Sequence, residues 1–223
     1  MKTARRTVVR AAARRGAARG KAASTTSPQA RRVRVARKTR ETDIVLTLDL
    51  DGQGRSQITT GIGFLDHMLT SLATHARFDL ELRCKGDLHV AAHHSVEDVG
   101  IVLGQALRQA LGDKQGLVRF GHAYCPLDEA LTRAVVDLSG RPWLSFFAQF
   151  RAQRVGDMPT ELVEDFFRAL SDHARLCLHL DMIRGRNAHH VIEALFKATA
   201  RALAMAVARD SRRSGVPSTK GSL

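Results

Sequence analysis

Hydrophobic and polar residues in the first half of the chain follow patterns typical of alternating strands and helices. Alternation and short apolar runs predict strands at residues 33–35, 44–50 and 78–84. Apolar residues at helical spacing predict helices at residues 64–75 and 99–111. The Asp51-Gly52 pair supplies a turn signal after the second strand. The first half therefore reads as strands, helix, strand, helix.

The second half repeats this order. Its expected strands are residues 121–125, 131–138, 143–150 and 176–180, and its expected helices are residues 160–173 and 194–208. Thr160 is the expected N-cap of the first of these helices, and Glu161 offsets the helix dipole. The repeated order predicts an internally duplicated α+β fold in which each sheet is covered on one face by two helices. We expect a first repeat at residues 31–117 and a second at 118–223, forming one compact unit.

One motif of His and Glu residues occurs twice. His93-His94-Ser95-Val96-Glu97-Asp98 recurs as His189-His190-Val191-Ile192-Glu193, shifted by 96 residues, at the start of each repeat's second predicted helix. On a helix, the first His and the Glu four residues later share a face and can bind one divalent ion. The second His points about 100° away, so it is better placed for a second ion. A lone His-His pair is usually a cap or a surface feature, but the repetition favours two metals shared between two halves.

The residue types limit the metals that fit. Imidazole and carboxylate ligands suit Mn, Fe, Zn or Ni. The three cysteines, Cys84, Cys125 and Cys177, are far apart, so they indicate no closed structural zinc site and are expected to stay reduced in a cytoplasmic protein. No stretch approaches the about 18 consecutive apolar residues of a membrane span.

The net charge of +13 comes from the N-terminal part of the chain. Residues 1–40 hold 14 Lys and Arg and no acid, which leaves 21 Lys and Arg against 22 acidic residues in the remainder. We expect residues 1–30 to be a disordered basic tail without a catalytic role. Non-specific polyanion binding, an organelle transit peptide and an extended start are the alternatives for this tail.

Six motifs occur in a fixed order between residues 34 and 220. They are Gly61-Ile62-Gly63-Phe64-Leu65-Asp66-His67-Met68-Leu69, Gly86-Asp87-Leu88, His93-His94-Ser95-Val96-Glu97-Asp98, Leu127-Asp128-Glu129-Ala130, Asp137-Leu138-Ser139-Gly140-Arg141-Pro142 and His189-His190-Val191-Ile192-Glu193-Ala194-Leu195-Phe196-Lys197-Ala198. Together they resemble the imidazoleglycerol-phosphate dehydratase family.

The resemblance implies a reaction, a fold and an assembly. The reaction is the dehydration of imidazoleglycerol phosphate to imidazole acetol phosphate plus water, in histidine biosynthesis. The fold is an internal duplication of two ribosomal-S5-domain-2-like units. The assembly is a homo-oligomer of 24 subunits built from trimers, with a site of two Mn²⁺ ions at subunit contacts.

The resemblance also implies metal ligands. One manganese would take His67, His94, His189 and Glu193, and the other would take His93, Glu97 and His190. Where family members place a further His ligand, this chain has Asp165, a shorter and charged oxygen donor. Direct binding, binding through water and an open position are the alternatives, and we expect altered metal affinity with retained activity. Ala91-Ala92 replaces the family's usual acidic pair, which should affect the orientation of ligands more than ligation.

Substrate contacts are implied in the same way. Glu41 is the nominated general base, although it can equally be an ordinary edge-strand carboxylate, and Glu97 and Glu193 are ligands that can also shuttle a proton. The residues expected to bind the phosphate are Arg119, Arg141, Lys197, Ser218, Thr219 and Lys220. His75 and Asp128 are weaker candidates that rest on motif position alone.

Two competing functions remain at this point. A hydrolase with two metals acting on a phosphate ester would use the same ligands and basic residues, but it would release phosphate. A basic nucleic-acid-binding protein is disfavoured by the nearly neutral body and by the single Trp and single Tyr, which cannot form an aromatic and basic platform.

Overall fold

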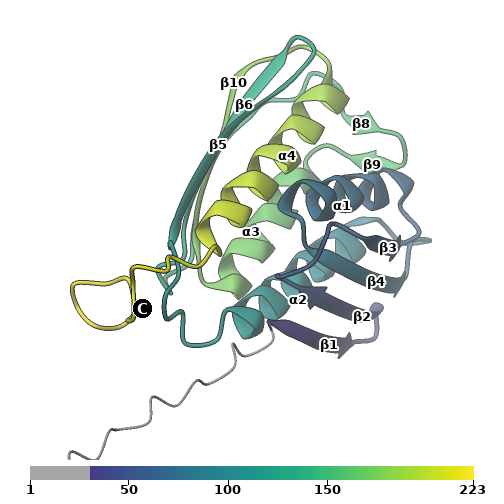
Figure 1. Cartoon of the computed structure of the whole chain (residues 1–223). Coiled ribbons are helices and arrows are strands. Elements are labelled where there is room, and N and C mark those ends of the chain that lie inside the picture. Colours follow the sequence, from purple (N-terminus) through teal and green to yellow (C-terminus); the bar gives the residue numbers. More distant parts are fainter. Residues whose placement is uncertain (1–30) are drawn as a thin grey trace, which may run out of the picture.

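The computed structural model describes residues 31–223, and its elements follow the expected order (Figure 1). The first half contains β1 (Arg32–Lys38), β2 (Thr42–Asp49), β3 (Ser56–Thr59), α1 (Gly63–Ala76), β4 (Asp79–Gly86) and α2 (His93–Leu111). The second half contains β5 (Phe120–Leu127), β6 (Ala130–Asp137), β7 (Trp143–Phe147), β8 (Arg154–Val155), β9 (Met158–Pro159), α3 (Leu162–Ala174), β10 (Cys177–Arg184) and α4 (Ala188–Ala206). The predicted basic tail lies outside the described residues.

Both halves build a four-stranded sheet with the same topology. The strand order is β1-β2-β4-β3 in the first sheet and β5-β6-β10-β7 in the second. In each sheet the first three strands are antiparallel, and the last pair, β4 with β3 or β10 with β7, is parallel. The shared topology confirms the predicted α+β duplication. The predicted repeat boundary, after residue 117, falls in the segment that joins α2 to β5.

The helices lie between the two sheets, so each sheet is covered on one face only (Figure 1). The helix α1 packs against α4, and α2 packs against α3, which joins the two halves in one core. At the centre of this layer, Phe166, Phe167 and Phe196 are fully buried and their ring centroids lie 4.7 to 5.2 Å apart. Burying one such side chain contributes roughly 1.5–3 kcal/mol, so this layer is a main source of stability.

Two glycines allow α2 and α3 to approach closely. A Cβ atom on Gly100 would lie 2.7 Å from the carbonyl oxygen of Phe166, and one on Gly104 would lie 2.8 Å from that of Leu170. Neither position has room for a side chain unless the helices separate. The close crossing fixes how the first and second repeats face each other.

Several local expectations were wrong. The strand β3 and the β8–β9 hairpin were not expected, because these segments are short and lack a clear apolar alternation. The strand predicted at residues 143–150 ends at Phe147. Thr160 does not cap α3: Glu161 holds the N-cap position without a side-chain bond, and the Thr160 hydroxyl donates to the carbonyl of Ala152 at 2.8 Å.

Two further features concern the state of the cysteines and the length of the apolar helices. All three cysteines are free, and burial raises the pKa of the Cys84 thiol to about 11. A thiol with a raised pKa stays protonated at neutral pH and is a poor metal ligand. Within residues 31–223, no helix is both long enough and apolar enough to cross a membrane.

We expect Gly104→Ala to destabilise the protein, because the added methyl group would strike the backbone of α3. Overpacking of this kind costs about 1–3 kcal/mol, which exceeds the helix-propensity gain of about 1 kcal/mol from replacing glycine. Thermal unfolding measures the effect. Gly215→Ala is the control, because nothing lies within 4 Å of a Cβ atom there. An unchanged or raised melting temperature for Gly104→Ala would contradict the close crossing.

Candidate metal centre

The packing of α1 against α4 brings together three residues with metal-binding side chains. The Nε2 atom of His67 lies 3.2 Å from Oε2 of Glu193, and Nε2 of His189 lies 3.0 Å from the same oxygen. One ligand atom from each of the three residues lies within 4.8 Å of the others. The family resemblance implied that His67 lies with His189 and Glu193, although α1 and α4 belong to different repeats. We call it the α1–α4 cluster.

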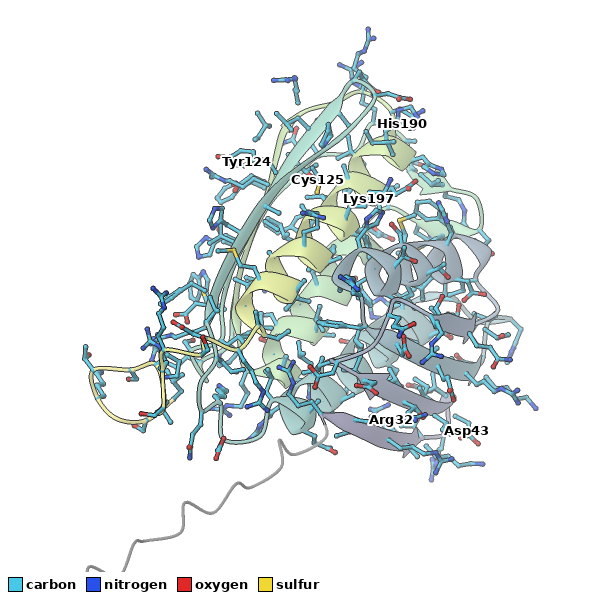
Figure 2. All side chains as sticks on the ribbon, in the orientation of Figure 1. Arg32, Asp43, Tyr124, Cys125, His190 and Lys197 are labelled. Carbon is cyan, nitrogen blue, oxygen red and sulfur yellow. The ribbon has the colours of Figure 1, made fainter. Side chains whose placement is uncertain are left out.

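Lys197 and a phenylalanine surround the α1–α4 cluster. Burial tends to raise the pKa of the Glu193 carboxyl, but hydrogen bonds from Lys197, at 2.7 Å, and from the two histidines lower it to about 2. Glu193 is therefore ionised at neutral pH and can act as a ligand. The ring of Phe64 packs edge-on against His189 with centroids 5.1 Å apart, which restricts the imidazole. Figure 2 shows His190 at the first end of α4 and Lys197 partway along the same helix.

A second and looser group lies where α2 meets α3. The Nδ1 atom of His93 is 3.6 Å from Oδ2 of Asp165, and Glu97 is exposed one helical turn further along α2. Asp165 lies in the first turn of α3, where it corresponds to His67 near the start of α1. The two repeats thus present related groups, but one has a carboxylate where the other has an imidazole. The sequence predicted Asp165 near the metal ligands without revealing its correspondence to His67.

His94 and His190 point away from these two groups and contact other acids. The Nδ1 atom of His94 lies 3.1 Å from both carboxylate oxygens of Asp87, and Nδ1 of His190 lies 2.7 Å from Oε2 of Glu129. These hydrogen bonds raise the pKa of both imidazoles. Within the one chain, the structure does not bring His94 to the α1–α4 cluster, nor His190 to His93.

The other nitrogen of each of these histidines faces an acid in a strand-to-strand turn. Nε2 of His94 is 3.7 Å from Oε1 of Glu41, and Nε2 of His190 is 3.7 Å from Oδ2 of Asp128. The two repeats therefore place an acid in the same position relative to the second His of the motif. Glu41 was predicted at the site from resemblance and Asp128 only as a weaker candidate.

Asp87 and Glu129 were not predicted as site residues. Glu129 also accepts hydrogen bonds from the backbone N–H groups of Arg186 and Asn187, at 3.0 and 2.7 Å. The bond from His190 is the largest cause that lowers the pKa of the Glu129 carboxyl to about 2. Such carboxylates fix the orientation and tautomer of a ligand His. Their only sequence signal is that each lies in one of the six motifs, directly at a turn.

The expected phosphate-binding residues divide into two places. Lys197 and the half-buried His75, whose pKa is lowered mainly by burial, lie beside the α1–α4 cluster. Arg119 is instead at the opposite end of α4, because its backbone N–H donates to the carbonyl of Ala206 at 2.9 Å. Ala206 is 17 residues after His189, which corresponds to about 26 Å along the axis of α4.

The guanidinium of Arg119 holds the C-terminal segment. It donates to both carboxylate oxygens of Asp137, at 2.7 and 3.1 Å, and to the carbonyl of Pro217 at 2.8 Å. Ser218, Thr219 and Lys220 follow directly, and the exposed Arg141 lies in the turn after β6. The structure therefore brings Arg119 close to the C-terminal candidates but separates them from the metal-binding side chains of the same chain.

Comparison with known proteins gives a consistent result over most of the chain. Residues 60–203 match the family model described as imidazoleglycerol-phosphate dehydratase. An imidazoleglycerol-phosphate dehydratase of Gluconobacter oxydans (strain 621H) is 60% identical over 196 residues, covering 87% of this chain and 99% of that protein. One of Acetivibrio thermocellus is 54% identical over 193 residues, covering 86% of this chain and 99% of that protein.

Solved structures of the same enzyme share the fold. The crystal structure of the Staphylococcus aureus dehydratase superposes with a TM-score of 0.73 at 46% identity, covering 79% of this chain and 98% of that one. The Pyrococcus furiosus enzyme, solved in complex with (S)-C348, gives a TM-score of 0.74 at 35% identity, covering 85% and 100%. The chain therefore belongs to the imidazoleglycerol-phosphate dehydratase family, a family of hydro-lyase enzymes.

Proposed function

We propose that this chain dehydrates imidazoleglycerol phosphate to imidazole acetol phosphate in histidine biosynthesis, using two Mn²⁺ ions. Family membership supports the reaction, and the α1–α4 cluster is the observation that supports the metal. Two imidazole nitrogens and an ionised carboxylate within 4.8 Å of one another form a donor set that suits Mn²⁺. The free cysteines take no part in this set.

Each ion would be held by residues from both repeats. His67, His189 and Glu193 would hold one ion, and His93, Glu97 and Asp165 would hold the other. The family pattern adds His94 to the first set and His190 to the second. Because both of these histidines point away from the clusters of their own chain, we propose that the partner subunit's His94 and the partner subunit's His190 complete the sets.

The bound ions would supply Lewis-acid polarisation and a template for the substrate. The chain's own residues would orient the ligands and move the proton. Asp87 and Glu129 hold the Nδ1 side of His94 and His190, which leaves Nε2 available on each imidazole. Glu41 is exposed beside His94, and its backbone is fixed by hydrogen bonds with Asp87 and with the Thr39 hydroxyl. A carboxylate that is fixed and accessible in this way suits the role of general base.

The phosphate end of the site supports an assembly of several copies. One substrate molecule is far shorter than the about 26 Å along α4 that separates Arg119 from His189. Arg119, Arg141 and the segment Ser218-Thr219-Lys220 can serve the metal centre only if they come from a different copy of the chain. We propose the assembly that the family resemblance implies, which is trimers forming a particle of 24 subunits.

The outer surface of the second sheet also supports association. Phe120, Tyr124, Trp143 and Phe147 lie on its uncovered face by strand register and are 53 to 69% exposed. We call this surface the outer aromatic face. Figure 2 shows Tyr124 pointing outward from β5. The rings form two pairs on the opposite edge strands β5 and β7, with the Arg133–Asp181 ion pair between them, so this face mixes aromatic and charged side chains. Protein interfaces are enriched in aromatic residues, and a second copy is the occupant that we propose here.

Metal removal tests the reaction itself. After the protein is stripped with a chelator, we expect imidazoleglycerol phosphate to be consumed only when Mn²⁺ is restored, giving the ketone without free phosphate. The metal-free protein should form no ketone, because the Lewis-acid polarisation that the ions supply is then missing. Parallel assays of ketone and inorganic phosphate make the measurement. Stoichiometric phosphate release would instead identify a hydrolase.

Substitution of Asp165 tests its role as a ligand. We expect Asp165→Ala to lower the bound Mn²⁺ from two ions toward one per chain and to reduce turnover, because one set loses an oxygen donor. Metal analysis by mass spectrometry after dialysis gives the content. Asp172→Ala is the matched control, since Asp172 lies exposed on the same helix. Unchanged metal content and rate in Asp165→Ala would exclude the ligand role.

Mixed oligomers test the division of the site between copies. We expect His189→Ala and Arg141→Ala to be nearly inactive separately, but activity to return when the two are co-expressed. If the two variants mix at random, about a quarter of the sites combine an intact metal-binding half from one copy with an intact phosphate-binding half from another. Steady-state rates of the purified mixed oligomer make the comparison. A mixed oligomer no more active than its parents would show that the halves belong to one chain.

A further inference from the structure

The β8–β9 hairpin is the part of the second repeat that has no counterpart among the described residues of the first. It lies between β7 and α3, whereas a short loop joins β3 to α1 in the first repeat. Thr160 anchors the base of this hairpin, because its backbone N–H donates to the carbonyl of Gln153 at 3.0 Å and its hydroxyl donates to that of Ala152 at 2.8 Å. The turn itself consists of Gly156 and Asp157.

Asp157 reaches from this turn to the N-terminus of α1 in the other repeat. Its carboxylate accepts hydrogen bonds from the backbone N–H groups of Gly63 at 2.7 Å and Phe64 at 3.2 Å, 94 and 93 residues earlier in the chain. The N-cap residue of α1, Ile62, has no side chain that can accept these bonds. A carboxylate here satisfies two otherwise unpaired N–H groups and opposes the positive end of the helix dipole.

The first turn of α1, which Asp157 holds, leads directly into His67, the proposed metal ligand. Phe64 packs against the ring of His189, and His67, three residues further on, lies with its ring centroid 5.7 Å from that of His189. His67 also contacts Glu193. A shift of the first turn of α1 would therefore move His67 relative to both α4 ligands.

Among residues 31–223, no side-chain carboxylate makes a comparable contact with the start of α3, the corresponding helix of the second repeat. In the first turn of α3, the N–H groups of Val163 and Glu164 donate to the backbone carbonyls of Thr160 and Glu161, at 3.2 and 3.3 Å. Asp165 in this helix lies 3.6 Å from His93, in the looser of the two groups. The carboxylate that joins the two repeats therefore serves only the helix of the tighter cluster.

We propose that Asp157 is a positioning residue for the metal centre. By holding the N-terminus of α1, Asp157 keeps His67 at the right distance from His189 and Glu193 to share one ion with them. This inference rests on the proposed metal-binding function. It assigns to the β8–β9 hairpin the task of aligning ligands that belong to different repeats. Asp157 itself contacts neither metal nor substrate.

The test compares the manganese affinity of Asp157→Ala with that of the unmodified full chain, by competition with a graded chelator. We expect the Kd of the tighter-bound ion to rise by roughly 10- to 100-fold, the usual cost of removing a residue that orients a ligand. Asp157→Asn keeps one oxygen acceptor and should restore part of the affinity. Unfolding is followed in parallel to report any loss of stability.

Asp79→Ala is the matched control. Asp79 also uses its carboxylate to accept two backbone N–H bonds, from Gln53 at 2.8 Å and Arg55 at 3.0 Å, but it lies away from the α1–α4 cluster. We expect this variant to lower the melting temperature without changing the Kd for Mn²⁺. If Asp157→Ala lowered only the melting temperature, as the control does, Asp157 would be an ordinary helix cap and the proposal would be overturned.

A second readout does not depend on metal. In the metal-stripped full chain, the rate of His67 modification by diethyl pyrocarbonate reports how firmly Glu193 holds the imidazole. We expect this rate to rise several-fold in Asp157→Ala while the rate for His75 stays constant. If the chain without substitutions bound no Mn²⁺, the proposed function would be refuted. The modification rate of His67 would still show whether Asp157 positions the His67 side chain. An unchanged rate would refute the positioning role.

Discussion

The packing of helices from one repeat against helices of the other is the constraint on which the site depends. Each four-stranded sheet can cover only one side of its two helices, so the uncovered sides must bury one another. Gly100 and Gly104 bring α2 and α3 close enough to do so. His67 reaches His189, and Asp165 reaches His93, only because of these crossings. The candidate metal centre is thus a product of the same contacts that hold the two halves together.

The internal duplication is close in topology but unequal in chemistry. Both repeats contribute a His-His-Glu motif, an acid that orients the second His, and a further acid in a strand-to-strand turn. The first helix of each repeat differs, with His67 in α1 and Asp165 in α3. The tighter cluster also has Lys197 beside its carboxylate and Asp157 at the start of its helix. Two ions bound in these places would not be held equally.

Periodic patterns in the sequence predicted most of the fold, whereas the doubled motif and the family resemblance supplied the candidate site residues. The long helices and alternating strands were found because their apolar faces repeat regularly, and the doubled motif placed His93 and His189 on helices. The β3 strand and the β8–β9 hairpin are too short to show a period. The contact from Asp157 to Gly63 spans 94 residues and depends on tertiary packing that no local pattern encodes. For the same reason the spacing along the sequence did not reveal that Arg119 and His189 lie at opposite ends of α4.

The placement of Arg119 at the far end of α4 also bears on how the protein would behave on dilution. On the proposed arrangement, an isolated chain carries two halves of different sites and no complete one. Assembly then contributes to catalysis by mass action, and the activity per chain falls as the concentration drops below the dissociation constant of the particle. Such an enzyme is inactive while newly made chains remain unassembled, so the cell gains turnover only once enough copies have accumulated.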